Sequence, residues 1–132
     1  MKKSNFLAVC FLASCLATSA IAEQTVKLTT SKTVGEKMRL MVNPKGTMSV
    51  NWGDGTFIEY PGTTENFRFL EGEVKGDTIV IKGSDLEWNM LGCAGQNIVT
   101  LNVSAAPGLR SLYCQNNEIK NLALSKVKNL TD

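Results

Sequence analysis

The last third of the chain repeats itself with a period of 21 residues, and this repeat constrains the fold more than any other feature. A shift of 21 positions places apolar residues on apolar residues and a serine on a serine. The matched pairs are Trp88 and Leu109, Leu91 and Leu112, Cys93 and Cys114, Ile98 and Ile119, Leu101 and Leu122, and Ser104 and Ser125. A repeat of this length indicates coils that bury their apolar edges only by stacking on one another. We therefore expect residues one period apart to be neighbours in space.

The spacing within one period suits neither a helix nor a single strand. In the segment LRSLYCQNNEIKNLALS, which begins at Leu109, Leu112 and Cys114 flank one outward residue, Tyr113. This is the alternation of a short strand, and it returns at residues 122–124. Each period thus predicts one coil with two short strands, which stacks on the next coil at about 4.7–4.9 Å.

The pattern L-x-x-L-x-C-x-x-N-x-I, which begins at Leu109, resembles the leucine-rich repeat family, whose core is L-x-x-L-x-L-x-x-N-x-L. Its nested half-period is similar to the short repeats of exported Bacteroides-type proteins. The resemblance implies coils at residues 88–108 and 109–129, with a third that begins at residue 130. It also implies that the expected ligand is a protein.

The asparagine position of the family falls on Asn117 in the second coil and on Gln96 in the first. We expect the Asn117 amide to satisfy backbone groups of neighbouring coils. A buried amide without a partner costs about 1–3 kcal/mol, so replacing this residue should destabilise the fold. The departures, Gln96 and Trp88, both fall in the first coil, and terminal coils are usually atypical.

Cys93 and Cys114 occupy the same position in successive coils, so we expect them side by side in the core. Free cysteine behaves as a small buried hydrophobe, and we predict two free thiols. A disulfide is the alternative, although parallel strands hold Cβ atoms farther apart than the ~3.8 Å that is typical of a bridge. The chain contains no histidine, and two thiols alone make no zinc site, so we expect no metal and no cofactor.

The first 22 residues have the layout of a secretory signal peptide. Lys2 and Lys3 precede an apolar run at residues 6–16, and the small-residue sequence at 20–22 marks the expected cleavage site. The run is too short for a membrane anchor. A lipoprotein acylated at Cys15 is the alternative. We therefore expect an exported protein, in the periplasm, at the cell surface or secreted.

From residue 23 to residue 83 the apolar period changes to two, which predicts an antiparallel β module of about six strands. The residues expected to face its core are Val26, Leu28, Met38, Leu40, Val42, Met48, Val50, Trp52, Ile58, Tyr60, Phe67, Phe69, Ile79 and Ile81. Its last strand, Thr78 to Lys82, is expected to pair with the first coil. The predicted fold is thus mainly β, with a small antiparallel β module that caps a short leucine-rich-repeat solenoid at residues 84–132.

The stretch W-G-D-G-T at residues 52–56 resembles the turn of polycystic-kidney-disease-like β-sandwich domains. We interpret it as a hairpin turn in which glycine supplies a positive φ. A calcium or sugar site built from Asp54, Glu59 and Trp52 is the competing interpretation, but the spacing falls short of a calcium loop. The carboxylate pairs 71/73 and 85/87 are expected to face water.

Composition excludes several classes of function. Without histidine, a nucleophile–base pair or a phosphate loop, the chain is predicted not to be an enzyme. Removing Lys2 and Lys3 reduces the 14 basic residues to 12, equal to the 12 acidic ones, so nucleic acid is not an expected partner. No apolar stretch after residue 22 is long enough to cross a membrane.

What remains is a binding or structural module. On the outer surface of the coils, Arg110, Tyr113 and Gln115 are the candidate binding residues, because Tyr and Arg often anchor interfaces. A protein is the expected partner and a carbohydrate the second candidate. The third coil has only begun when the sequence reaches Asp132, so self-association through that uncapped end, or continuation in a longer protein, is the structural alternative.

Overall fold

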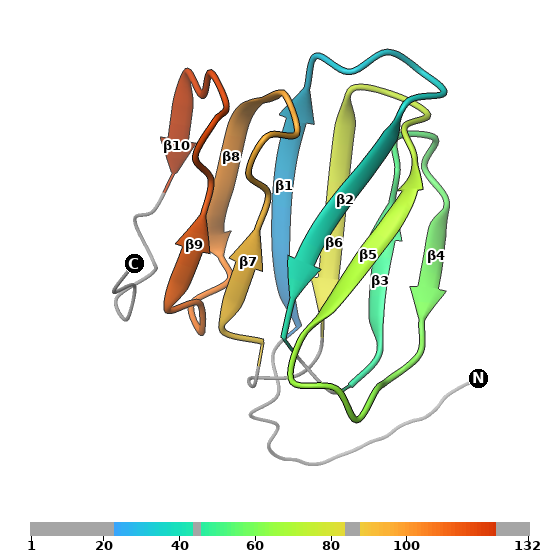
Figure 1. Cartoon of the computed structure of the whole chain (residues 1–132), viewed down its shortest axis with the longest axis vertical. Coiled ribbons are helices and arrows are strands. Elements are labelled where there is room, and N and C mark those ends of the chain that lie inside the picture. Colours follow the sequence, from blue (N-terminus) through green and yellow to red (C-terminus); the bar gives the residue numbers. More distant parts are fainter. Residues whose placement is uncertain (1–22, 44–45, 84–87, 124–132) are drawn as a thin grey trace, which may run out of the picture.

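The computed structural model describes residues 23–43, 46–83 and 88–123. The expected signal peptide with Cys15, the carboxylate pair 85/87 and the expected start of a third coil lie outside the described residues. The described residues form ten strands (Figure 1): β1 (Gln24–Thr30), β2 (Lys37–Val42), β3 (Met48–Asn51), β4 (Phe57–Tyr60), β5 (Arg68–Glu73), β6 (Thr78–Gly83), β7 (Met90–Gly92), β8 (Ile98–Ala105), β9 (Ser111–Tyr113) and β10 (Asn121–Ala123).

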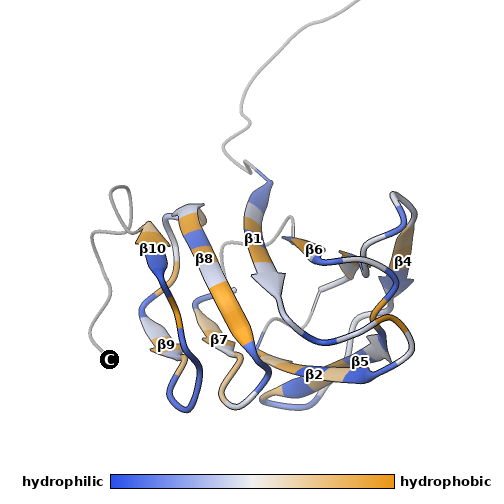
Figure 2. Cartoon of the chain, turned by 90° about the horizontal axis from the view of Figure 1, so that it is seen from above, coloured by the Kyte–Doolittle hydropathy of each residue, from blue (hydrophilic) through white to orange (hydrophobic). Residues whose placement is uncertain are grey.

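The strands form two sheets, which lie as two rows in the view from above (Figure 2). One sheet has six strands in the order β10-β8-β1-β6-β3-β4, and the other has four in the order β5-β2-β7-β9. Most neighbours are antiparallel, but β7 with β9 and β8 with β10 are parallel, so both sheets are mixed. The chain is therefore mainly β, as its apolar patterning predicts.

A single apolar core fills the space between the sheets. On β1, Val26 and Leu28 are buried, whereas Lys27 between them is exposed to water. The same core cluster includes Leu91 and Leu101 from the repeat. Residues 23–83 and the repeat thus share one core, because alternating strands of both parts turn their apolar faces to the same interior.

Residues one period apart lie side by side. Leu91 of β7 is opposite Leu112 of β9, and Leu101 of β8 is opposite Leu122 of β10. Both registers correspond to an offset of 21 residues. β7 belongs to the four-stranded sheet, β8 to the six-stranded sheet, and β9 again to the four-stranded sheet. Each period of the repeat therefore passes through both sheets.

The turns after β7 and β9 have the same left-handed backbone at equivalent positions. Gly95 has a φ of 68° and Asn116 a φ of 62°. Glycine and asparagine are the residues that tolerate this conformation most readily. Backbone hydrogen bonds continue past the strand ends, from Cys93 N–H to the carbonyl of Tyr113 at 2.8 Å and from Gly95 N–H to that of Gln115 at 3.0 Å.

The strand that pairs with the repeat in the six-stranded sheet is β1, so the expected pairing of β6 with the first coil is wrong. Both edges of β6 are occupied, by β1 and β3, and β1 has the free edge that accepts β8. The Gln24 amide donates to the carbonyl of Trp88 at 3.1 Å and accepts from Gly108 N–H at 2.7 Å. At the other end, the Thr30 hydroxyl donates to the carbonyl of Gln96 at 3.0 Å.

The expected burial of Phe67 and Phe69 is also wrong, because the core face of β5 carries the other set of residues. Leu70 is buried, whereas Phe67 and Phe69 are 47% and 43% exposed. Gly72 lies on the core face as well, and a Cβ there would come within 2.3 Å of the Trp52 ring. The indole of Trp52 needs this space, so β5 turns Gly72 inward and Phe69 outward, and Phe67 just before the strand faces outward as well.

On β4 the expectation of a buried face holds for Tyr60 only in part and fails for Ile58, which is 45% exposed. Ile58 is opposite the buried Val50, but β4 is the edge strand of its sheet. Tyr60 packs against the core and its hydroxyl links the two sheets. It accepts from the indole N–H of Trp52 and donates to the carbonyl of Glu71, both at 2.9 Å.

Candidate functional site

The outer face of the four-stranded sheet carries one row of side chains that crosses all four strands. The strand registers place Phe69 opposite Met41, Met41 opposite Gly92, and Gly92 opposite Tyr113. Gly92 is the member of this row without a side chain, and the side chain of Met41 lies over it. The sequence therefore builds a depression between aromatic residues at the two edges of the sheet.

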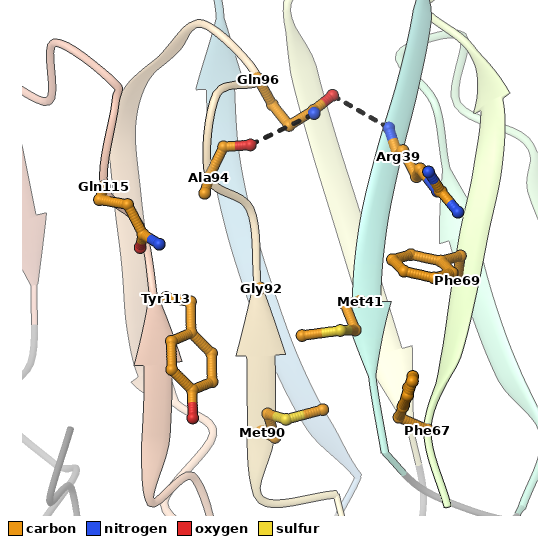
Figure 3. A pocket seen from close by; sticks show the side chains of 10 residues that line it. All are labelled: Arg39, Met41, Phe67, Phe69, Met90, Gly92, Ala94, Gln96, Tyr113 and Gln115. Atoms are coloured by element: carbon orange, nitrogen blue, oxygen red, sulfur yellow. Dashed lines mark hydrogen bonds between the residues drawn. The ribbon is translucent and has the colours of Figure 1, made fainter. Parts of the chain in front are cut away.

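This depression is an open groove with a volume of about 550 Å³ (Figure 3). Phe69 of β5 and Phe67 just before this strand lie on one side and Tyr113 of β9 on the other, and all three rings are exposed. Its lining residues are Arg39, Met41, Phe67, Phe69, Met90, Gly92, Ala94, Gln96, Tyr113 and Gln115. Exposed aromatic and methionine side chains gathered in one hollow are typical of interaction surfaces.

Arg39 is the charged residue of the groove lining, and its charge is compensated. Its guanidinium lies 3.7 Å from the centre of the Phe69 ring, and its Nε is 3.1 Å from a carboxylate oxygen of Glu71. Both ionic side chains are more than half exposed, so this pair contributes little to stability. Because Glu71 compensates the charge of Arg39, the groove lining offers no uncompensated charge to a ligand.

The polar groups at one end of the groove are partly engaged already. Gln96 accepts from the backbone N–H of Arg39 at 3.0 Å and donates to the carbonyl of Ala94 at 3.3 Å (Figure 3). Gln96 is the residue of the first coil that is equivalent to Asn117 of the second. Asn117 bonds to the coil before it, whereas the longer side chain of Gln96 bonds to β2. Gln115 and Tyr113 are exposed residues on the opposite wall.

Of the three candidate binding residues, the structure brings two into this groove. Tyr113 and Gln115 line it, whereas Arg110 is exposed but is not part of the lining. The backbone N–H of Arg110 donates to the carbonyl of Asn89 at 2.7 Å, at the start of the β7–β9 pairing. Sequence reasoning therefore located one wall of the groove, whereas Arg110 lies outside the lining.

Four of the ten lining residues come from the β module, to which the sequence analysis gives the role of a cap. These are Phe67 and Phe69, which the alternation predicts in the core, and Arg39 and Met41, for which the sequence predicts no role in binding. The signal that could have revealed them is the stretch NFRFLEGEV at residues 66–74, which has apolar residues at both parities. Both faces of such a strand carry large apolar side chains, so one of them has to be exposed.

Asn117 connects the two coils through its side-chain amide. Its Oδ1 accepts from the N–H groups of Gln96 and Ile98, both at 3.0 Å. Its Nδ2 donates to the carbonyls of Cys93 at 2.9 Å and Cys114 at 3.1 Å. One side chain thus satisfies backbone groups of its own coil and of the preceding one.

We expect Asn117→Leu to lower the free energy of unfolding by about 1–3 kcal/mol, because these backbone groups lose their partner and the leucine offers none. Urea denaturation followed by circular dichroism measures the change. Asn121→Leu is the matched control, since Asn121 is exposed on β10, and we expect a change below about 0.5 kcal/mol there. Equal effects of the two substitutions would contradict a bridging role for Asn117.

Cys93 and Cys114 are free thiols in the same positions of adjacent coils. Cys93 is buried and Cys114 is half-buried. Burial, together with the nearby charge of a Cys114 thiolate, raises the pKa of Cys93 from 9.0 to about 12. Because the thiolate is the reactive form, Cys93 is poorly suited to nucleophilic chemistry.

The raised pKa of Cys93 predicts that stability falls with pH above 9.0. Below that value the thiol is protonated in both states; between 9.0 and about 12 the unfolded chain loses a proton that the folded chain retains. The contribution to the free energy of unfolding then decreases by about 1.4 kcal/mol per pH unit. Denaturation midpoints across this range should therefore decline less steeply in Cys93→Ala than in the unsubstituted protein, and parallel slopes would refute the prediction.

The W-G-D-G-T stretch forms a tight turn. Asp54 Oδ1 accepts from Thr56 N–H at 3.0 Å, and Asn51 Oδ1 accepts from the N–H groups of Gly53 and Gly55 at 2.9 and 3.0 Å. Gly53 and Gly55 both have positive φ angles. Among the residues that the structure describes, no three His, Cys, Asp or Glu side chains cluster as metal ligands would. The local contacts of Asp54 are thus those of a turn residue.

Comparison of the chain with known proteins places it in no family. No protein-family model matches it, and neither a curated protein nor a solved structure does. Within the described ranges, no helix has the length and apolar character needed to cross a membrane. Any functional conclusion therefore depends on the groove itself.

Proposed function

We propose that this chain is an exported, non-catalytic binding module that uses the groove on its four-stranded sheet to hold a partner protein. Its architecture is that of a small antiparallel β module capping a short solenoid of leucine-rich-repeat type. The parallel 21-residue registers and the Asn117 amide support the repeat assignment. The signal-peptide layout of residues 1–22 supports export to the periplasm or the cell surface, with acylation at Cys15 as the alternative.

The observation that carries the proposal is the groove with its exposed Phe67, Phe69 and Tyr113. Large apolar side chains on the surface cost free energy unless a partner covers them, and aromatic residues dominate the binding energy of protein interfaces. Met41 and Met90 between these walls add unbranched side chains that adapt to a ligand. A protein surface with apolar side chains matches this lining best.

The test is selection of peptides on the intact mature protein from a phage-displayed random library. We expect the selected peptides to lose at least about tenfold in affinity on Tyr113→Ala and on Phe69→Ala, because each substitution removes an aromatic wall. Ile58→Ala is the control, since Ile58 is equally exposed but lies on the other sheet. Peptides that bind all three variants as tightly as the unsubstituted protein would refute the proposal.

A carbohydrate is the second candidate ligand of the same groove, because sugar rings also stack on aromatic side chains. A glycan array probed with the same variants distinguishes the two. Glycan binding that depends on Tyr113 and Phe69, without peptide binding, would replace the protein partner by a carbohydrate.

Self-association is the alternative role, and the exposure of Leu122 favours it. This side chain is 44% exposed although it is opposite the buried Leu101. An exposed strand edge with an apolar side chain is a template for pairing with a second copy. Light scattering over a concentration series tests this role, which requires an apparent mass that rises with concentration and returns to the monomer value in Leu122→Lys.

A further inference from the structure

Cys93 and Cys114 are two thiols inside the fold that the proposed binding function does not use. The register of β7 with β9 continues past the strand ends, where Cys93 N–H donates to the carbonyl of Tyr113, the residue before Cys114, at 2.8 Å. Both cysteines point inward, two residues after Leu91 and Leu112 of the core. Their Cβ atoms are therefore neighbours at the strand spacing of about 4.7–4.9 Å.

The amide of Asn117 fixes this spacing. Its Nδ2 donates to the carbonyl of Cys93 at 2.9 Å and to that of Cys114 at 3.1 Å. One side chain thus holds the backbone of both cysteines, and it is itself anchored through Oδ1, which accepts from the N–H groups of Gln96 and Ile98. A pair supported in this way is arranged for a ligand before the ligand arrives.

The spacing is too long for a disulfide and matches a metal bridge. Cβ atoms joined by a disulfide lie about 3.8 Å apart, which is closer than neighbouring parallel strands bring them. Thiolate–metal bonds of about 2.3 Å place two sulfur atoms about 4.6 Å apart when the ion lies on the line between them. Side chains in the same rotamer on adjacent strands hold their sulfur atoms at about this separation.

We propose that Cys93 and Cys114 form a two-coordinate site for one soft metal ion, Cu(I) or Hg(II), held in a line between the two thiolates. Thiolates select soft ions, and these two accept only two ligands. Zinc needs further ligands, whereas the chain has no histidine and its described residues bring no third Cys, Asp or Glu to the pair. The site lies between the coils and is separate from the groove.

Binding exchanges protons for the ion without a redox step. Two S–H bonds break, two sulfur–metal bonds form, and both protons pass to the solvent. Burial, and secondly the charge of a Cys114 thiolate, raise the pKa of Cys93 to about 12. Two adjacent thiolates therefore repel each other, and a cation between them removes this repulsion. Cys114 is only half-buried, which gives the ion a route to the pair.

The experiment adds Hg(II) or Cu(I) to the intact, reduced mature protein without oxygen, with the monothiol glutathione as competitor. We expect native mass spectrometry to show one ion per chain, and with Hg(II) a mass gain equal to the metal less two protons. X-ray absorption should show two sulfur neighbours at one distance. The melting temperature should rise, because the unfolded chain does not hold the thiols side by side. The ion that is retained against glutathione identifies the natural class of ligand.

Interchanging Leu112 and Cys114 provides a matched control. The variant with Leu112→Cys and Cys114→Leu keeps the composition and both thiols, but it moves one thiol along the strand by about 6.4–6.8 Å. We expect its affinity for the ion to fall at least about tenfold. Melting temperatures without metal establish that the variant is folded, and the stoichiometry and X-ray absorption of the unsubstituted protein need no variant.

Four results would overturn the inference. They are loss of both ions to glutathione, binding of two ions per chain, equal affinity in the interchanged variant, and a mature protein that is isolated with a disulfide between Cys93 and Cys114. Peptide binding that depends on Tyr113 and Phe69 is measured separately. The metal site and the groove can therefore each be rejected without the other.

Discussion

Replacing Trp88 with alanine is expected to lower the free energy of unfolding by about 3–5 kcal/mol, which is a large share of the stability of a small domain. Trp88 is fully buried where the β module meets the repeat. Its indole N–H donates to the carbonyl of Met90 at 3.0 Å, and its own carbonyl accepts from the Gln24 amide at 3.1 Å. Alanine leaves a cavity between the two parts of the core and removes the indole hydrogen bond.

Urea denaturation followed by circular dichroism measures this effect, because the fluorescence of Trp52 alone would report one region. Trp88→Leu is the informative comparison, since leucine is the residue that the repeat places at the equivalent position, Leu109. We expect it to cost less than alanine but still about 1–3 kcal/mol, because a smaller residue leaves part of the cavity. A cost below about 1 kcal/mol for Trp88→Ala would show that the core can close around the vacancy.

The second large effect is expected at Gly53, where alanine should cost about 3–5 kcal/mol. Its φ of 121° lies in a region that side-chain-bearing residues rarely adopt. A Cβ at this position would also lie 2.2 Å from the backbone nitrogen of Gly76. The neighbouring Lys75 N–H donates to the carbonyl of Trp52 at 2.8 Å, so the two backbones are held together and cannot simply separate.

Gly55 provides a matched control within the same turn. Its φ of 87° is also positive, but a Cβ there would meet no atom within 4 Å. Gly55→Ala therefore measures conformational strain without the clash, and we expect about 1–2 kcal/mol. Thermal and urea denaturation of both variants give the difference. Equal losses at the two positions would contradict a close backbone contact between Gly53 and Gly76.

Local patterns predicted the elements of this protein well. Alternation of apolar residues identified the strands of residues 23–83, and Val26, Leu28 and Ile81 are buried as expected. The 21-residue period identified Leu91 and Leu112 as neighbours. These features depend on residues close in sequence or on a strict repeat, so a single chain contains the information they require.

The arrangement of the elements was harder to predict. Which face of β5 is buried depends on Trp52, which occupies the space above Gly72. Which strand pairs with β8 depends on β6 being occupied on both edges. The local sequence pattern predicts neither of these two features, because each is decided by elements that are distant in sequence.

By itself, the sequence determined that this chain forms short strands in a mainly β fold, with successive repeats stacked so that Leu91 lies beside Leu112. Only the tertiary structure decided that Phe67 and Phe69 face outward and form, with Tyr113 across Gly92, a groove that joins the β module to the repeat. The physical reason is that period-two alternation defines the two faces of a strand, whereas long-range packing decides which of these faces is exposed to solvent.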